Sequence, residues 1–282
     1  MASFSERQGL KEVRSLVQRD SLDADTRREI WNLLAVLPPE FNSFYRDETE
    51  RQTLESLWIW HFEKARDEMP TLGKMWVWIK EAVYSAPWNE VLDLLERFAK
   101  YWERNETGAS APLRRAFVSA LNDTFESNLV AYRVIGLEIT PVDSNAEAEA
   151  VSAALLDADP IAGARHALDR ALELLADRQT PDYPNSIKES ISAVEAVVRM
   201  MTGEGTLGAG LSKLEAAGLK LHSALKGAWS KMYGWTSDED GVRHGSIEAA
   251  SADQALAKYV LVTCSAFVSY LIEEGRKTGL LK

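Results

Sequence analysis

The sequence predicts a mainly α-helical protein with two helical domains and a small β-hairpin near residues 129–142. In most segments large apolar residues recur three and four positions apart, which is typical of helices with one buried face. One short stretch instead alternates β-branched and aromatic residues around Gly136, as a hairpin does. The chain has 282 residues and exceeds the usual domain size of roughly 100–200 residues, so we expect two packed units.

The first half of the chain predicts a series of helices. Asp23 precedes an acidic first turn, and apolar residues then recur at helical spacing until Pro38 and Pro39 stop the pattern. Seven of the nine tryptophans lie before residue 103, and their helical spacing favours core packing over a stacking surface, so we assign no site to them. Further helices are expected over residues 53–63, 72–84, 89–103 and 113–127.

The second half predicts a helical bundle behind the hairpin. A polar, acidic stretch at residues 143–149 places the domain boundary between residues 145 and 146. We therefore expect domains over residues 1–145 and 146–282. Gly218 is a point where one of the expected helices could be interrupted. Helices are expected over residues 146–156, 160–177, 185–201, 211–233 and 251–274.

The charge of the chain is unevenly distributed. The formal net charge of −11 argues against generic attraction to nucleic-acid phosphates. From residue 181 onward there are 11 Lys or Arg against 12 Asp or Glu, which leaves 21 against 31 for residues 1–180. The C-terminal part is therefore −1 and the N-terminal part −10, so RNA would meet less repulsion at the C-terminal part.

Composition also indicates a cytoplasmic protein without a membrane span. The uncharged segment 259–272 is shorter than the roughly 18 apolar residues that a spanning helix needs, and the N-terminus lacks the apolar run of a secretory signal. The only cysteine, Cys264, lies in this apolar segment, which favours a buried, inert thiol and excludes an internal disulfide. His61, His166 and His222 stand alone, so we expect neither a metal site nor a cofactor.

The loop at residues 233–246 is the first candidate site. It gathers acids, including Asp238, with Arg243 and His244 between glycines, where the chain must turn and stay partly exposed. A histidine can accept or donate a proton near neutral pH, and an arginine can hold a phosphate with two hydrogen bonds. The same residues equally suit a capping loop in which Asp238 and its acidic neighbours neutralise Arg243.

The second candidate is a polar stripe on the helix expected over residues 185–201. It could supply the other half of a site. Its members recur three, four and seven positions apart and so share one side of the helix. A solvated face explains the stripe as well. The stripe consists of Asn185, Lys188, Glu189, Ser192 and Glu195.

Two motifs carry a resemblance to a known family. YPNSIKESISAVEA at residues 183–196 and YGWTSDEDGVRHG at residues 233–245 resemble the C-terminal region of bacterial AbiJ-like abortive-infection proteins. The opening FSERQGL at residues 4–10 is similar to the start of their N-terminal domain. The resemblance implies an AbiJ-type N-terminal domain over residues 1–145, acting as a sensor, and a HEPN-like bundle over residues 146–282, acting as the effector.

The HEPN resemblance implies a metal-independent ribonuclease toxin used in antiviral defence, with RNA as substrate and a homodimer as the active form. His244 would handle protons, Arg243 would steady the phosphate, and Asn185 and Glu189 would orient the histidine, with Lys188 and Asp238 binding substrate. The sequence departs from the family pattern because no arginine stands five to seven positions before His244. The alternative is therefore a non-catalytic HEPN-like module that binds a nucleotide, RNA or a protein. The phage-derived trigger is not evident from the sequence.

Overall fold

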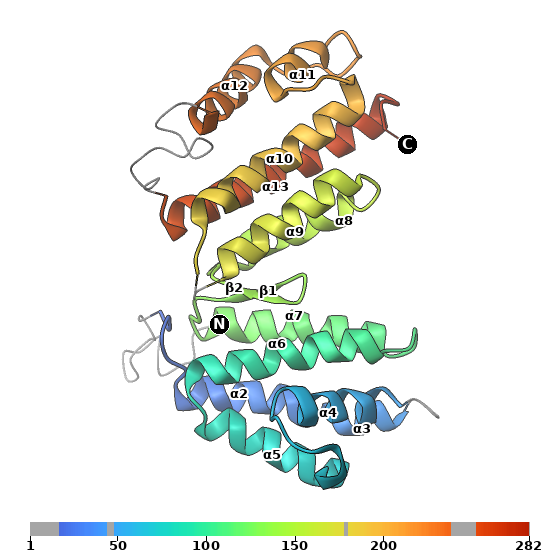
Figure 1. Ribbon diagram of the computed structural model, residues 1–282, viewed down its shortest axis with the longest axis vertical. Helices are drawn as coiled ribbons and strands as arrows, with labels where there is room; N and C mark the ends of the chain where they lie inside the picture. The colour runs from blue at the N-terminus through green and yellow to red at the C-terminus, as the bar shows by residue number, and fades with distance from the viewer. Residues whose placement is uncertain (1–16, 44–47, 178–179, 238–251, 282) are drawn as a thin grey trace, which may run out of the picture. The chain divides into compact units, whose positions relative to one another are not determined.

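The computed structural model describes residues 17–43, 48–177, 180–237 and 252–281, and it is mainly helical, as predicted (Figure 1). The chain forms two compact units. Unit 1 comprises Met1–Ile139 with Asp143–Asn145, and unit 2 comprises Thr140–Val142 with Ala146–Lys282. Each unit has its own buried apolar residues and is described by itself.

Unit 1 is a helical domain built around the aromatic face of α6. Val91, Leu94, Leu95, Phe98 and Trp102 recur at helical spacing and are each at most 1% exposed. Phe98 packs edge-on against Trp102 and Phe117, with ring centroids 5.7 Å apart in both pairs. The helices of unit 1 are α2 (Ala24–Ala35), α3 (Leu37–Ser43), α4 (Thr49–Trp60), the 3-10 helix η1 (Arg66–Glu68), α5 (Leu72–Ser85), α6 (Trp88–Asn105) and α7 (Ala111–Ser127).

One expected helix limit in unit 1 is confirmed and another is wrong. Helix α2 ends at Ala35, before Pro38 and Pro39, which lie in the first turn of a separate short helix, α3. Proline fits there since the N–H groups of a first helical turn have no partner within the helix. The helix expected over residues 53–63 begins four residues earlier, at Thr49, and ends at Trp60.

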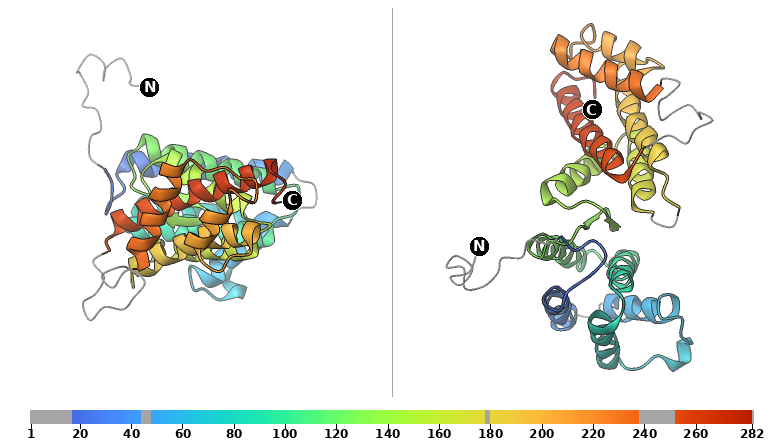
Figure 2. Two further views of the ribbon diagram at one scale, coloured as in Figure 1. Left: turned by 90° about the horizontal axis from the view of Figure 1, so that it is seen from above. Right: turned by 90° about the vertical axis from the view of Figure 1, so that its left-hand side faces the viewer.

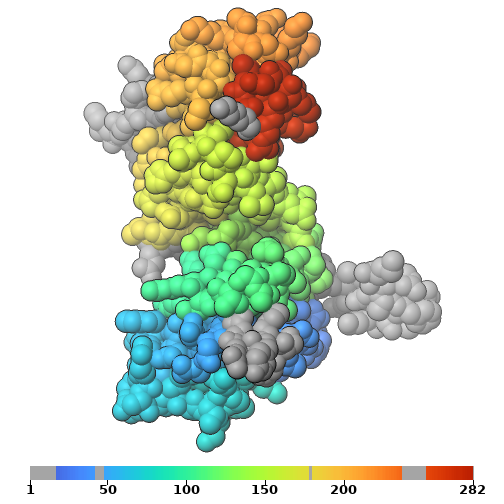
Figure 3. Space-filling model, turned by 90° about the vertical axis from the view of Figure 1, so that its right-hand side faces the viewer, coloured from blue at the N-terminus to red at the C-terminus, as the bar shows by residue number. Residues whose placement is uncertain are grey.

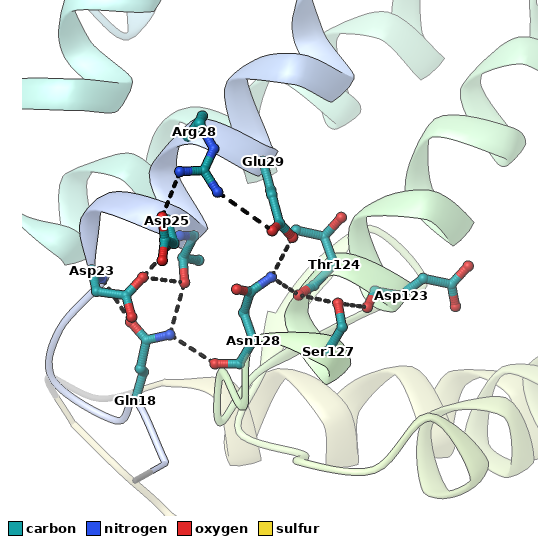
Figure 4. Close-up of polar contacts among 10 residues, drawn as sticks. Gln18, Asp23, Asp25, Arg28, Glu29, Asp123, Thr124, Ser127 and Asn128 are labelled. Atoms are coloured by element: carbon teal, nitrogen blue, oxygen red, sulfur yellow. Dashed lines mark hydrogen bonds and ion pairs between the residues drawn. The ribbon is translucent and has the colours of Figure 1, made fainter. Parts of the chain in front are cut away.

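A buried cluster of polar side chains joins the segment before α2 to the end of α7 through hydrogen bonds (Figure 4). Nε2 of Gln18 donates to Oγ1 of Thr26 (2.8 Å) and to the backbone oxygen of Asn128 (2.7 Å). Nδ2 of Asn128 donates to Oε2 of Glu29 (2.6 Å) and to the backbone oxygen of Thr124 (2.9 Å). Gln18 and Asn128 are 7% and 4% exposed, so these bonds replace the hydrogen bonds to water that the two side chains lose on burial.

The predicted hairpin is confirmed as strands β1 (Arg133–Ile135) and β2 (Glu138–Thr140). Gly136 and Leu137 have φ values of +55° and +73°, as in the two-residue turns that match the twist of paired strands. The buried guanidinium of Arg133 donates to backbone oxygens of residues 130, 132 and 143 and to Oδ1 of Asn145. These bonds fix the chain on both sides of the hairpin.

Unit 2 is a helical bundle with α10 at its centre. Its helices are α8 (Asn145–Asp157, from residue 146 on), α9 (Ala162–Ala176), α10 (Tyr183–Thr202), α11 (Leu207–Lys213), α12 (Ser223–Ser237) and α13 (Gln254–Lys277). Helix α10 packs against α9 and α13. Oγ of Ser186 on α10 donates to the backbone oxygen of Ala171 on α9 (2.8 Å), and small residues allow this close approach.

The directions of the helices in unit 2 follow from two contacts. A Cβ atom added at Gly275, near the end of α13, would lie 2.7 Å from Cε of Met201, near the end of α10, so these helices run parallel (Figures 1 and 2). The rings of Trp229 on α12 and Phe267 on α13 stack at 4.0 Å, while Trp235 and Tyr259 line one cavity, so α12 and α13 run antiparallel. The last turns of α13, red in Figure 3, reach the surface of unit 2.

The single helix expected over residues 211–233 is wrong. The chain forms α11 and α12, and a turn lies between them. Gly218 has a φ of +104°, a left-handed conformation that side chains with a Cβ rarely adopt. The N–H of Leu219 then bonds to the backbone oxygen of Leu214 (2.9 Å), which closes the turn.

Helix α13 contains the apolar segment singled out in the sequence. By length and composition alone it is the one helix in the described part of the chain that could cross a membrane, and half of its apolar window is buried in the protein. A core helix of a globular domain has the same composition, and Val260, Leu261 and Val268 on α13 are fully buried. The burial pattern therefore favours a core helix.

Candidate functional site

Three helix ends lie at the same side of unit 2, which we call the loop-bearing end. It is formed by the start of α10, the end of α12 and the start of α13. Because α10 and α13 are parallel and α12 is antiparallel to α13, these ends lie at the same side of the bundle. Asp238, Arg243 and His244 belong to the connection between α12 and α13 and lie outside the described residues.

Asn185 lies in the first turn of α10 and is exposed. Asp182, the N-cap residue, accepts the backbone N–H of Asn185 at Oδ1 (3.2 Å) and its side-chain Nδ2 at Oδ2 (2.6 Å). Such bonds satisfy N–H groups that have no acceptor within the helix. Asn185 thus takes part in the helix cap through its two nitrogen atoms. Its side-chain oxygen is the atom with which it would orient another group.

Lys188 and Glu189 form a charged pair one turn further along α10. Nζ of Lys188 is 3.8 Å from Oε1 of Glu189, and the two side chains are 44% and 24% exposed. Partly exposed pairs of this kind contribute little to stability, so both groups could rearrange at small cost to meet a ligand. Ser192 is less available because its hydroxyl donates to the backbone oxygen of Lys188 (2.9 Å).

In the described ranges of the chain, no group of three His, Cys, Asp or Glu side chains is placed to hold a metal ion. Cys264 is fully buried, and burial raises the pKa of its thiol well above the usual range. The burial expected from the sequence is confirmed, and a thiol with a raised pKa is a poor nucleophile because it supplies little thiolate.

The described residues of unit 2 also line two cavities that the sequence analysis did not identify. One, of about 300 Å³, lies between α12 and α13 and is lined by aromatic residues. The other, of about 330 Å³, is mainly apolar and lies near the C-terminus, where Arg276 is 3.6 Å from Asp157. Each joins residues from distant segments, so a local sequence pattern does not reveal it.

A comparison with protein families now adds to this geometry. The family described as AbiJ N-terminal domain 4 matches residues 2–157, which is more than half of the chain. The chain belongs to this AbiJ family. No curated protein and no solved structure matches it. Membership places the protein in the context of abortive infection, a form of defence, and confirms the AbiJ-like resemblance of its N-terminal part.

The AbiJ match extends beyond unit 1 to the end of α8, and residues 158–282 lie outside it. Within the described part of the AbiJ N-terminal domain, one cluster of titratable residues surrounds His61, at the end of α4. Burial lowers the pKa of His61, as does the neighbouring Arg97, while Asp93 and Glu90 oppose this shift. Burial also raises the pKa of Asp93. These surroundings disfavour protonation of His61, whose ring packs edge-on against Phe62 with the ring centroids 4.9 Å apart.

Proposed function

We propose that this AbiJ-type protein is a cytoplasmic antiphage effector whose unit 2 is a HEPN-type, metal-independent endoribonuclease. One observation carries the proposal. The start of α10, with motif 183–196, and the two ends that flank motif 233–245 lie at the same loop-bearing end of unit 2. Two motifs separated in sequence could therefore contribute to one site. The N-terminal domain would sense a phage-derived trigger or a partner.

The proposed chemistry needs only side chains and the RNA itself. His244 would take the proton of a ribose 2′-hydroxyl, which attacks the adjacent phosphate, and would return a proton to the leaving oxygen. Arg243 would stabilise the charge that develops on the phosphate. Asn185 and Glu189 would orient the histidine, and Lys188 and Asp238 would contact the substrate. A homodimer, as in related HEPN enzymes, is part of the same proposal.

A second candidate function is a non-catalytic module that binds a nucleotide, RNA or a protein. Two observations favour it. No arginine stands five to seven positions before His244, and the amide of Asn185 is engaged by its helix cap. In this case another subunit would supply the chemistry, and unit 2 would act through recognition alone.

RNA integrity in cells distinguishes the two functions. Cells expressing the wild type or His244→Ala would be compared before and after phage infection, with protein level and helical content checked in parallel. The ribonuclease proposal expects cleaved RNA with the wild type only. Intact RNA with a wild type that still protects the cells would contradict it and favour the binding module.

A further inference from the structure

The cavity between α12 and α13 has the chemistry of a stacking site. Its walls are Ala228, Trp229, Met232 and Trp235 from α12 and Tyr259 and Thr263 from α13. Trp235 and Tyr259 remain 40% and 61% exposed although both are large aromatic residues. Beneath them the rings of Trp229 and Phe267 already stack, with 12° between their planes. The cavity therefore presents accessible aromatic side chains next to a buried, stacked aromatic pair.

We call this cavity, with its exposed Trp235 and Tyr259, the aromatic groove. The charge around the aromatic groove differs from that of the whole chain. Helix α12 contains Lys226 and Lys231 and no acid, and the only charged residue from 254 to 272 is Lys258, although the chain carries −11. Lys231 is exposed, lies one turn before Trp235 and forms no ion pair with any described residue. Lys258 is already 3.2 Å from Glu147. Among the described residues, Lys231 is thus an exposed cation close to Trp235 that could meet an anionic ligand, whereas Lys226 is half-buried and lies nine positions before Trp235.

From these observations we infer that the aromatic groove binds a nucleobase of single-stranded RNA, with Lys231 near its phosphate. The inference rests on the proposed action of unit 2 on RNA. Every base offers an aromatic face, and stacking on exposed aromatic side chains is how proteins hold single strands without reading their sequence. The volume of about 300 Å³ is at the lower limit of ligand sites, which suits one planar ring system.

The groove adjoins the loop-bearing end, since Trp235 is near the end of α12 and Tyr259 near the start of α13. A base held there would keep the strand beside the connection that carries Arg243 and His244. Asp238, Glu239 and Asp240 follow α12 directly in sequence and repel phosphates. Affinity should therefore depend on stacking more than on charge, and it should change little with salt.

The test measures binding separately from cleavage. The full chain would be titrated into a fluorescent 2′-O-methyl oligoribonucleotide of about eight nucleotides, which lacks the hydroxyl needed for cleavage. Trp235→Ala and Tyr259→Ala should each weaken binding about tenfold, whereas Trp235→Phe, which keeps a stacking ring, should lose less than about threefold. Trp60→Ala is the matched control, because Trp60 is an exposed tryptophan of unit 1. It should bind like the wild type.

Each outcome bears on the inference. Unchanged binding by both alanine variants would overturn it, as would a wild type that binds no RNA. If the aromatic groove instead joins two copies of the chain, sedimentation would show a dimer that Tyr259→Ala dissociates. This result would also overturn the inference. Competition by a free mononucleotide at the same affinity as RNA would identify a nucleotide site and would overturn the inference. Groove-dependent binding without RNA cleavage in cells would contradict only the proposed nuclease.

Discussion

His61 shows how a single half-buried residue can make stability depend on pH. Its pKa in the folded protein lies below the value of about 6.5 for an exposed histidine, mainly because it is half-buried. The unfolded chain therefore binds a proton more readily than the folded one as pH falls. Stability is unaffected above about pH 6.5 and is lost as the pH drops through and below that value.

We expect His61→Gln to reduce this loss. Urea unfolding of the wild type and the variant at about pH 7.5 and pH 5.5 gives the change in unfolding free energy for each protein. The change should be smaller for His61→Gln, and His166→Gln, which alters an exposed histidine, should behave like the wild type. An equal pH dependence in all three proteins would show that His61 is freely protonated in the folded state.

Residues of this kind mark the limit of what the sequence predicts. The burial of Cys264 follows from the apolar segment around it, and the sequence identifies it correctly. The environment of His61 depends on Phe62 and on Asp93 and Arg97 of a helix thirty positions away. Such a contact is decided by tertiary packing, so a local pattern cannot reveal it.

Among the helices, the attachment of α2 to α7 depends on a buried amide. Asn128→Ala removes one hydrogen bond to the Glu29 carboxylate and one buried hydrogen bond to the backbone oxygen of Thr124, so we expect a loss of about 1–3 kcal/mol in unfolding free energy. Ser127→Ala is the matched control, because Ser127 is exposed and bonds only within the turn, to the backbone of Asp123 and Thr124. Denaturant unfolding measures both variants. Equal stability of the two would exclude a structural role for the Asn128 amide.

The turn between α11 and α12 explains why two helices were expected as one. Leu211, Leu214 and Leu225 keep a helical spacing across the break, and apolar periodicity does not record the backbone conformation of Gly218. By contrast, the long periodic face of α6 was predicted almost to its ends, because five large side chains fix it in one core. Element type is thus more predictable than a turn within an apolar pattern.

Replacing each of two glycines of this region by alanine should change stability in opposite directions. A Cβ at Gly218 meets no atom within 4 Å, but its φ of +104° makes Gly218→Ala destabilising by about 1 kcal/mol. Gly227 lies inside α12, also in open space, so Gly227→Ala should stabilise by roughly 0.5–1 kcal/mol. Thermal unfolding of both variants checks the signs. A stabilising Gly218→Ala would mean that the turn is not required.

For the whole molecule, the sequence predicted the helical class and the AbiJ relationship, and it predicted only part of the candidate site. The polar start of α10 was found because its residues share one helix face. The aromatic groove was missed because Trp235 and Tyr259 come together only when α12 and α13 pack antiparallel. The roles of Arg243 and His244 rest on the resemblance and remain part of the proposal.

The final prediction concerns what the whole molecule does to its host. If unit 2 is a nuclease, overexpression of the wild type should arrest growth without infection, and His244→Ala should restore growth by removing the proton transfer. His166→Ala changes another histidine of unit 2, on the exposed side of α9, and should stay as toxic as the wild type. Growth curves at matched protein levels measure the effect. Arrest that persists in a folded His244→Ala protein would remove this histidine from the mechanism and leave recognition, through the loop-bearing end or the aromatic groove, as the activity of unit 2.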